Sequence, residues 1–298
     1  MTRVLSTLLN LSTLVFAVTS MLSVGFTYTL KEIIDPLRNV RGVLVALLAN
    51  FVLVPLLAYV VTRLLTLEPS MEIGLILVST AAGAPFLIKL AQMADGDLAF
   101  AAGLLVLLLV VTMAYMPLVV PLIAPDAAVS TTSIAKPLVL TMLLPLGVGL
   151  FVDAWNEPLT MRLLPFMNKA SSLALVLLVG STFLLNFQAI LGVFGTGAIL
   201  GALVVIGAAF GLGYVLGGPG TRTREVMGLG TAQRNIAAAT VVATQSFDNT
   251  NTVVMVVVTS IVSMALLFPV AGVLRKRGAK RAAISAATGG LSRKTPWV

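Results

Sequence analysis

The chain is dominated by long apolar runs that are separated by short polar segments. Runs of about 20 apolar residues have the length at which an α-helix crosses the hydrocarbon core of a bilayer. They predict nine transmembrane helices, near residues 6–29, 42–65, 71–93, 98–123, 135–155, 163–185, 190–217, 226–247 and 251–274. The first run is too long for the apolar region of a signal peptide, so we count it as a mature span. The expected fold class is an all-α polytopic membrane protein.

The apolar runs also contain a weak internal repeat. The segment RGVLVALLANFVLVPLLAYVV at 41–61 matches TGAILGALVVIGAAFGLGYVL at 196–216, at an offset of 155 residues. The triplet Asp95-Gly96-Asp97 matches Asn249-Thr250-Asn251 at an offset of 154. Spans one to four thus resemble spans six to nine. Five spans separate each matching pair, so the two copies have opposite orientations in the membrane, which is typical of secondary transporters.

Spans three and eight, which are partners in this repeat, each contain helix-breaking residues. Span three contains Gly83-Ala84-Pro85, and a proline inside a helix removes a backbone hydrogen bond and clashes with the preceding turn. Span eight contains Gly228 and Gly230, followed by a polar cluster. A broken helix exposes unpaired amides and a partial positive charge at its new N-terminus, which suits an anion. We therefore predict a substrate site at the two interruptions, formed by Gly83, Ala84, Pro85, Lys89, Thr231, Gln233, Arg234 and Asn235.

Two of these residues are cations inside apolar spans. Lys89 lies four residues after Pro85, on the same helical face. Arg234 lies midway along an uncharged run, where a guanidinium costs about 2.5 to 3.5 kcal/mol on insertion scales. The alternative is that each cation extends its long side chain to the membrane interface, and Lys89 has acids nearby for this. Since Arg234 has no acid in its own span, we predict that both cations lie at one central site and bind an anionic substrate.

Composition narrows the class of protein further. Only 10% of the residues are charged, whereas soluble domains contain about 25%. Cysteine and histidine are both absent, which excludes thiolate metal sites and cysteine nucleophiles and removes the usual general base. We predict no metal, no cofactor and no enzymatic activity. An intramembrane hydrolase would also need a pair of acids.

The basic residues predict the orientation. With nine spans, fourteen lysines and arginines fall on one side of the membrane and three on the other, and the two remaining cations lie inside spans. The positive-inside rule then places the N-terminus outside and the C-terminus in the cytoplasm of an inner (plasma) membrane. The segment 275–298 forms a basic cytoplasmic tail, expected to be disordered over 282–298. Such a tail suits anionic lipid, and we do not expect nucleic-acid binding.

Three segments resemble the bile acid:sodium symporter family: SMLSVGFTYTLKEI at 20–33, the Gly-Ala-Pro break, and GTAQRNIAAA at 230–239. The resemblance extends over about residues 10 to 275. It implies an inverted-repeat fold in which two broken helices cross within a core domain and the substrate binds beside the crossing. The implied core covers about 42–123 and 190–274, and a second, panel domain covers about 6–30 and 135–185.

The chain departs from this family at the residues that ligate sodium. The family's second broken helix carries Glu-x-Gly-x-Gln-Asn, and alignment on Asn235 places Gly230 at the glutamate and Arg234 at the glutamine. The family's Ser-Asn pair in the first broken helix falls on aliphatic residues just before Lys89. These replacements offer no oxygen ligands. The hypothesis is that Lys89 and Arg234 stand in place of sodium ions and that transport does not depend on sodium.

The leading function is therefore a secondary transporter or facilitator of a small organic anion, a monocarboxylate, that works by alternating access. One alternative is a sodium-coupled symporter of organic anions or bile acids with altered sites, and another is a membrane receptor that binds without transporting. A cation/proton antiporter would need carboxylates at the membrane midplane. An arsenite permease would be expected to carry a cysteine in its first broken helix.

Overall fold

A computed structural model of the chain describes residues 2–123, 131–185, 187–247 and 250–291, and these ranges contain helices but no β-strand. Helices satisfy every backbone polar group within one segment, as the interior of a bilayer requires. In chain order they are α1 (Thr2–Thr27), α2 (Leu30–Ile34), the 3-10 helix η1 (Asp35–Arg38), α3 (Val40–Leu48), the π-helix η2 (Ala49–Leu53), α4 (Val54–Leu64), α5 (Pro69–Thr80), α6 (Phe86–Met93), α7 (Leu98–Ile123), α8 (Thr131–Leu138), the π-helix η4 (Val139–Leu143), α9 (Leu144–Trp155), α10 (Glu157–Leu185), α11 (Phe187–Gly192), α12 (Ala198–Leu216), α13 (Thr221–Ala232), α14 (Ile236–Ser246) and α15 (Thr250–Leu291).

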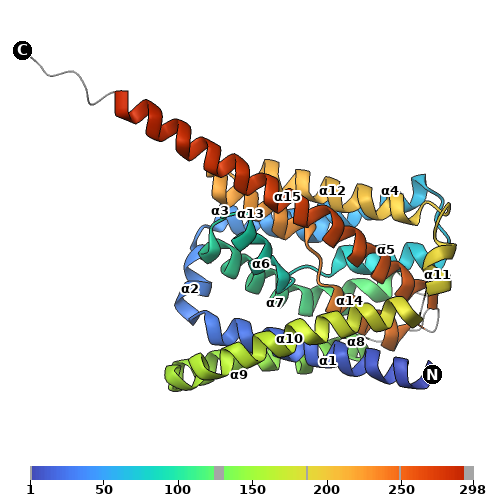
Figure 1. Ribbon diagram of the computed structural model, residues 1–298. Helices are drawn as coiled ribbons and strands as arrows, with labels where there is room; N and C mark the ends of the chain where they lie inside the picture. The colour runs from blue at the N-terminus through green and yellow to red at the C-terminus, as the bar shows by residue number, and fades with distance from the viewer. Residues whose placement is uncertain (1, 124–130, 186, 248–249, 292–298) are drawn as a thin grey trace, which may run out of the picture.

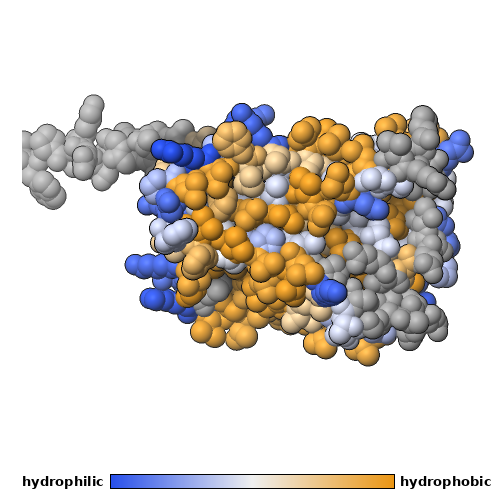
Figure 2. Space-filling view, turned by 90° about the horizontal axis from the view of Figure 1, so that it is seen from below, coloured by the Kyte–Doolittle hydropathy of each residue, from blue (hydrophilic) through white to orange (hydrophobic). Residues whose placement is uncertain are grey.

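Seven stretches of continuous helix among the described residues are long and apolar enough to cross a membrane. They are Leu5–Thr27, Val40–Leu64, Leu98–Leu122, Ile134–Trp155, Glu157–Leu185, Ala198–Leu216 and Asn251–Lys280. They coincide with seven of the nine predicted spans. The other two, 71–93 and 226–247, are each divided into two short helices, so a length criterion does not test them. Figure 2 shows apolar side chains over the middle of one face and hydrophilic residues chiefly toward the two ends.

The interruptions predicted in spans three and eight are confirmed. In span three α5 ends at Thr80 and α6 begins at Phe86, after Pro85 at the N-cap position. In span eight α13 ends at Ala232, and α14 begins after the N-cap residue Asn235. Gly228 and Gly230, the predicted helix-breaking residues of span eight, lie inside α13. The break comes after them, at the polar cluster Gln233 to Asn235.

Two helices contain a π-helical turn just before a proline. The turn η2 precedes Pro55 and the turn η4 precedes Pro145. A proline has no amide to donate to the carbonyl four residues earlier, and a wider turn accommodates this gap. At the first turn that carbonyl belongs to Phe51, and the hydroxyl of Tyr115 on α7 donates to it at 2.6 Å. The proline and a side chain from another helix therefore shape this turn together.

Two boundaries differ from those expected from the sequence. Span seven was predicted to begin at residue 190, but α12 begins at Ala198, because Gly195 and Gly197 have φ angles of +88° and +82° that no helix contains. The predicted tail is helical as far as Leu291, because α15 continues through the basic residues. Residues 292–298 lie outside the described residues.

The helices pack in two groups (Figure 1). One group contains α1, α9 and α10, and the other contains α5, α12, α13 and α15. These are helices expected in the panel and the core, respectively. The helix α8 departs from this grouping, because it packs against α7 and α14.

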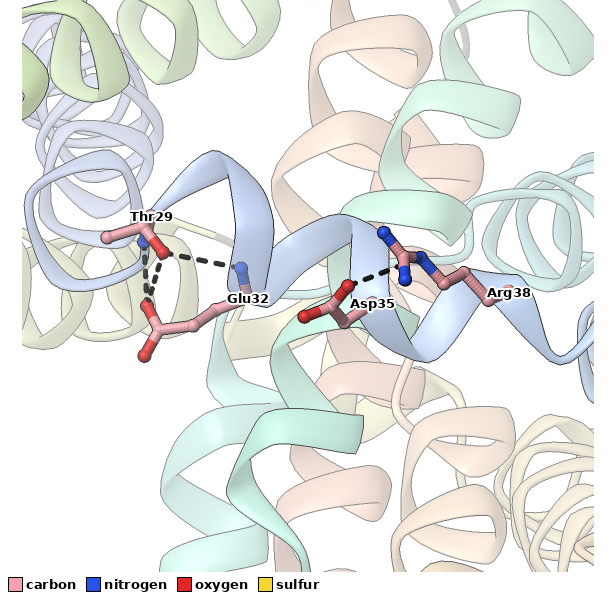
Figure 3. Close-up of polar contacts among 4 residues, drawn as sticks. All are labelled: Thr29, Glu32, Asp35 and Arg38. Atoms are coloured by element: carbon pink, nitrogen blue, oxygen red, sulfur yellow. Dashed lines mark hydrogen bonds and ion pairs between the residues drawn. The ribbon is translucent and has the colours of Figure 1, made fainter.

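Four segments that belong to the predicted cytoplasmic side lie at one end of the bundle. The helix α2, the turn between α9 and α10, the start of α13 and the outgoing part of α15 are all at the left in Figure 1. At this end Thr29 and Glu32 form a reciprocal capping box at the start of α2, and Arg38 pairs with Asp35 at 3.3 Å (Figure 3). The hydrogen bonds from the amide and hydroxyl of Thr29 hold the pKa of the Glu32 carboxyl below its ordinary value.

Candidate functional site where the two broken helices meet

The two interruptions contact each other through one asparagine. The backbone amide of Asn235 donates to the carbonyl of Ala81 at 2.8 Å, and its side-chain amide donates to the carbonyl of Gly83 at 3.0 Å. The Asn235 Oδ1 accepts from the amide of Ala238 at 3.0 Å and so caps α14. Asn235 is buried, and it supplies hydrogen bonds to both breaks at once.

The first break is held from its other side by α7. The hydroxyl of Thr112 accepts from the amide of Ala82 at 3.1 Å and donates to the carbonyl of the same residue at 3.0 Å. Gly83 has a φ of +77°, and a Cβ atom there would lie 2.3 Å from the backbone nitrogen of Leu109. Non-helical backbone at this depth is tolerated only where protein encloses it, and Ala81 and Ala82 are fully buried.

Arg234 is completely buried beside the same contact. Its Nη1 donates to the carbonyl of Ser79 at 3.2 Å, and its Nη2 donates to the Oδ1 of Asn50 at 3.1 Å and to the carbonyl of Thr231. Ser79 and Thr231 lie in the last turns of α5 and α13, where carbonyls lack partners within the helix and carry partial negative charge. The guanidinium thus joins the C-terminal ends of two half-helices.

Side chains from both π-helical turns reach the second break. Asn50, from η2, accepts from Arg234, and its Nδ2 donates to the carbonyl of Ala46 at 2.9 Å and to the hydroxyl of Thr231 at 3.3 Å. Met142, from η4, places its sulfur 3.7 Å from the Nδ2 of Asn235. Neither residue was among the predicted site residues. The available signal was a proline five or three residues later, which indicates a disturbed helix but not the side chain that it brings to the site.

The predicted site residues come together with one exception. Gly83, Ala84, Thr231, Gln233, Arg234 and Asn235 are buried around the meeting point, and Pro85 is half-buried at the start of α6. Gln233 accepts from the hydroxyl of Ser263 at 3.3 Å. Lys89, however, is exposed one turn into α6 and is not among the residues that bond to Arg234, so a central site shared by the two cations stays a prediction. The exposure of its long side chain fits the alternative stated for it.

An open cleft lies beside the meeting point, with about 480 Å³ of empty space, including the part open to the outside. Both half-helices α6 and α14 begin at this cleft, so the positive dipole ends of two helices lie at its wall. Most of the remaining wall is apolar. The lining residues are Phe16, Ala84, Pro85, Phe86, Leu175, Leu178, Gln233, Arg234, Asn235, Ile236, Ala237, Ser260 and Met264.

The charge of Arg234 has no acidic partner among the described residues. The ion pairs found there are Arg38–Asp35, Arg63–Glu72 and Arg222–Asp95, and all three lie at helix ends. The oxygen atoms around the guanidinium are neutral. The meeting point therefore carries a net positive charge next to the cleft.

Membrane-length helices, two broken helices in contact and a buried charge at their breaks define the class of helical secondary transporters. The chain belongs to the sodium bile acid symporter family, whose sequence model matches residues 14–193, more than half of the chain. The protein is thus a multi-pass member of a family of membrane transporters.

Curated relatives agree with this assignment. The chain is 25% identical to the probable sodium/metabolite cotransporter BASS3, chloroplastic, of Arabidopsis thaliana over 207 residues, 69% of this chain and 48% of that protein. It is 25% identical to the probable sodium/metabolite cotransporter BASS1, chloroplastic, of the same plant over 273 residues, 90% of this chain and 68% of that protein. The chain therefore spans about half to two thirds of the length of these relatives.

Proposed function

We propose that the protein is a secondary transporter of a small organic anion, a monocarboxylate, which works by alternating access and does not require sodium. The observation that carries this proposal is the position of the Arg234 guanidinium, bound to the carbonyls of Ser79 and Thr231 and to the Oδ1 of Asn50.

Arg234 supplies a unit positive charge where relatives would bind an ion. A sodium ion needs several oxygen ligands, as hard cations generally do. Here the oxygen atoms of α5, α13 and η2 surround a cation that is covalently attached and cannot dissociate. Because no sodium ion would bind at this site, a sodium gradient could not drive substrate transport through it. Because Lys89 is exposed, the proposal now assigns the replacement of sodium to Arg234 alone.

The cleft suits a carboxylate with an apolar body. The starts of α6 and α14 offer their positive dipole ends to one anionic group, beside the charge of Arg234. Phe16, Leu178 and Met264 supply apolar contacts for the remainder. One polar end and one apolar wall favour a monocarboxylate over a dicarboxylate, because a second carboxylate would lose its hydration without gaining a partner.

Contacts at both ends of the bundle support the inverted repeat and the nine spans. Arg222 at the start of α13 pairs with Asp95 after α6 at 3.0 Å. Asn251 after α14 donates to Glu68 at the start of α5 at 2.9 Å. Glu68 and Arg222 are 154 positions apart, the offset of the sequence repeat. Each contact links the start of one broken helix to the segment after the other.

The proposed setting is an inner (plasma) membrane, with the N-terminus outside and the C-terminus in the cytoplasm. The division into a core of about 42–123 and 190–274 and a panel of about 6–30 and 135–185 is part of the same proposal. The grouping of α1, α9 and α10 apart from α5, α12, α13 and α15 supports it.

Uptake into proteoliposomes tests the proposal. We expect saturable uptake of a labelled monocarboxylate at the same rate in sodium and in choline buffers. Arg234→Gln should abolish uptake, whereas Arg222→Gln, which removes an exposed arginine from the start of α13, should preserve it.

The names of the relatives favour a sodium-coupled symporter as the second candidate. A steep dependence of uptake on the sodium gradient would establish that candidate and exclude ours. Ligand binding without any flux would instead favour a receptor.

A further inference from the structure

The side-chain amide of Asn50 has a fixed orientation next to Arg234. Its Oδ1 accepts from the Arg234 Nη2 at 3.1 Å. Its Nδ2 donates to the carbonyl of Ala46 at 2.9 Å and to the hydroxyl of Thr231 at 3.3 Å. Rotating the amide by half a turn would point its NH₂ group at the guanidinium and lose these bonds. Asn50 is fully buried, so water cannot replace any of them.

The backbone under Asn50 is unusual as well. The residue lies in the π-helical turn Ala49–Leu53, just before Pro55. Such turns interrupt the regular hydrogen bonding of a helix and occur frequently at functional sites. The turn lies within the second predicted span, and it brings the amide of Asn50 into contact with Thr231 at the end of α13.

A carboxylate at position 50 would bind the guanidinium more strongly, but it could not donate to the carbonyl of Ala46. Aspartate has nearly the shape of asparagine, and its hydrogen bond to a guanidinium is charge-assisted. Buried arginines are ordinarily paired with acids for this reason. Among the described residues no ion pair includes Arg234, and the preceding acid in the sequence, Glu225, lies nine residues earlier, in α13. The amide of Asn50 thus donates to the carbonyl of Ala46 and leaves the charge of Arg234 in place.

We propose that Asn50 is a positioning residue that orients the Arg234 guanidinium without neutralising it, and that the cleft prefers carboxylates to neutral molecules of the same shape because of this amide. The inference rests on the proposed function, since it concerns the anion site of that transporter. It adds a residue that sets charge selectivity without touching the substrate.

Two variants separate the charge of residue 50 from its hydrogen bond. Asn50→Asp keeps the contact to Arg234 and cancels its charge. Asn50→Ala removes the contact and leaves the charge. Purified full-length protein is titrated with four carboxylates and their amides: propanoate, butanoate, 3-methylbutanoate and hexanoate, each against the corresponding alkanamide. The readout is the ratio of carboxylate to amide affinity, with the melting temperature measured on the same samples.

We expect Asn50→Asp to lower the carboxylate affinity roughly tenfold, as removal of a unit charge at about 10 Å does at an effective dielectric constant near 20. The amide affinities should be maintained, and the melting temperature should fall, because an aspartate cannot donate to the carbonyl of Ala46. Asn50→Ala should lower the melting temperature and also the affinity ratio, because the guanidinium loses the contact that orients it. If Asn50 is purely structural, Asn50→Ala will lower the melting temperature and leave the ratio unchanged.

The outcomes also separate this inference from the proposed function. If wild-type protein prefers carboxylates and Asn50→Asp retains that preference, the inference is wrong and the proposed function stands. If wild-type protein binds none of the carboxylates, or shows no preference for them, both are wrong. Arg222→Gln serves as the control for net charge, because it removes one positive charge at the exposed start of α13. An equal loss of preference in that variant would also overturn the role of Asn50.

Discussion

A buried guanidinium is tolerated at the breaks because neutral oxygen atoms from three elements surround it. Ser79 and Thr231 contribute carbonyls at helix ends, where a cation is stabilised by the helix dipole, and Asn50 contributes its amide oxygen. The same bonds hold α5, α13 and η2 together. Arg234 therefore has a structural role as well as the proposed electrostatic one, and an experiment has to separate the two.

Chemical rescue separates them. Arg234→Ala leaves an empty space lined by three unpaired acceptors, so we expect a loss of at least about 2 kcal/mol in unfolding free energy. Millimolar guanidinium should restore part of the melting temperature and of the uptake, because it donates hydrogen bonds to the same oxygen atoms. Tetramethylammonium, which cannot donate, is the control and should restore neither. Recovery that is equal with both cations would show that the oxygen atoms do not form a directed cation site.

Gly83 is the backbone position where the first break is most constrained. Any side chain would have to adopt a φ near +77° and place a Cβ atom 2.3 Å from the nitrogen of Leu109. We expect Gly83→Ala to lower the unfolding free energy by about 2–4 kcal/mol through strain and displacement of α7. The control is Gly207→Ala in α12, where a Cβ meets nothing within 4 Å. Its melting temperature should be unchanged or slightly higher, and equal losses in the two variants would contradict the argument.

At the level of the helical element, proline and tyrosine cooperate at the first π-helical turn. Pro55 cannot donate to the carbonyl of Phe51, and Tyr115 donates in its place. We expect Tyr115→Phe to cost about 1–2 kcal/mol, because it leaves a buried carbonyl unpaired. In a Pro55→Ala background the alanine amide can donate instead, so the same change should cost less. Chemical denaturation of the four proteins gives the coupling energy, and additive losses would contradict this account.

The short helix α2 gives a prediction for pH. Thr29 lowers the pKa of the exposed Glu32 carboxylate in the folded protein. A group with a lowered folded pKa contributes stability above its unfolded pKa, and that stability is lost as the pH falls through the folded value. The contribution should therefore be present at neutral pH and lost below the ordinary glutamate value of about 4.3. Thr29→Ala should raise the pKa of Glu32, as measured by NMR titration, and an unchanged pKa would contradict the capping role.

The breaks could be predicted from sequence as elements, but not in their detail. Gly83 and Pro85 predict the first break, because the backbone preferences of these two residues are sufficient to interrupt the helix. The second break depends on Asn235, which caps α14 while bonding to a carbonyl 152 positions away, a contact that no local pattern encodes. For the same reason the exposure of Lys89 could not be predicted, because spacing gives a helical face but not which way that face points. The π-helical turns were missed because a proline alone indicates only that a hydrogen bond is absent.

At the scale of the whole molecule, the number of membrane crossings determines whether the two repeats have opposite orientations. Labelling of two introduced cysteines can measure that number. The chain has no cysteine of its own, so Glu68→Cys and Asn156→Cys, both at exposed positions, give unambiguous labelling. Three predicted spans separate these residues if 71–93 crosses the membrane, and two separate them if it does not. Nine spans therefore place them on opposite sides, with Glu68→Cys labelled by an impermeant maleimide on intact cells and Asn156→Cys only after permeabilisation.

A third position tests the second broken span in the same way. Four predicted spans separate residue 156 from Lys280 if 226–247 crosses, so Lys280→Cys should behave like Asn156→Cys. Labelling of Lys280→Cys on intact cells would mean that 226–247 does not cross, and a shared side for Glu68→Cys and Asn156→Cys would mean the same for 71–93. Either result would remove the opposed orientation of the two broken helices. The cleft could then not be exposed to each side in turn, and a binding role without transport would account better for the buried arginine.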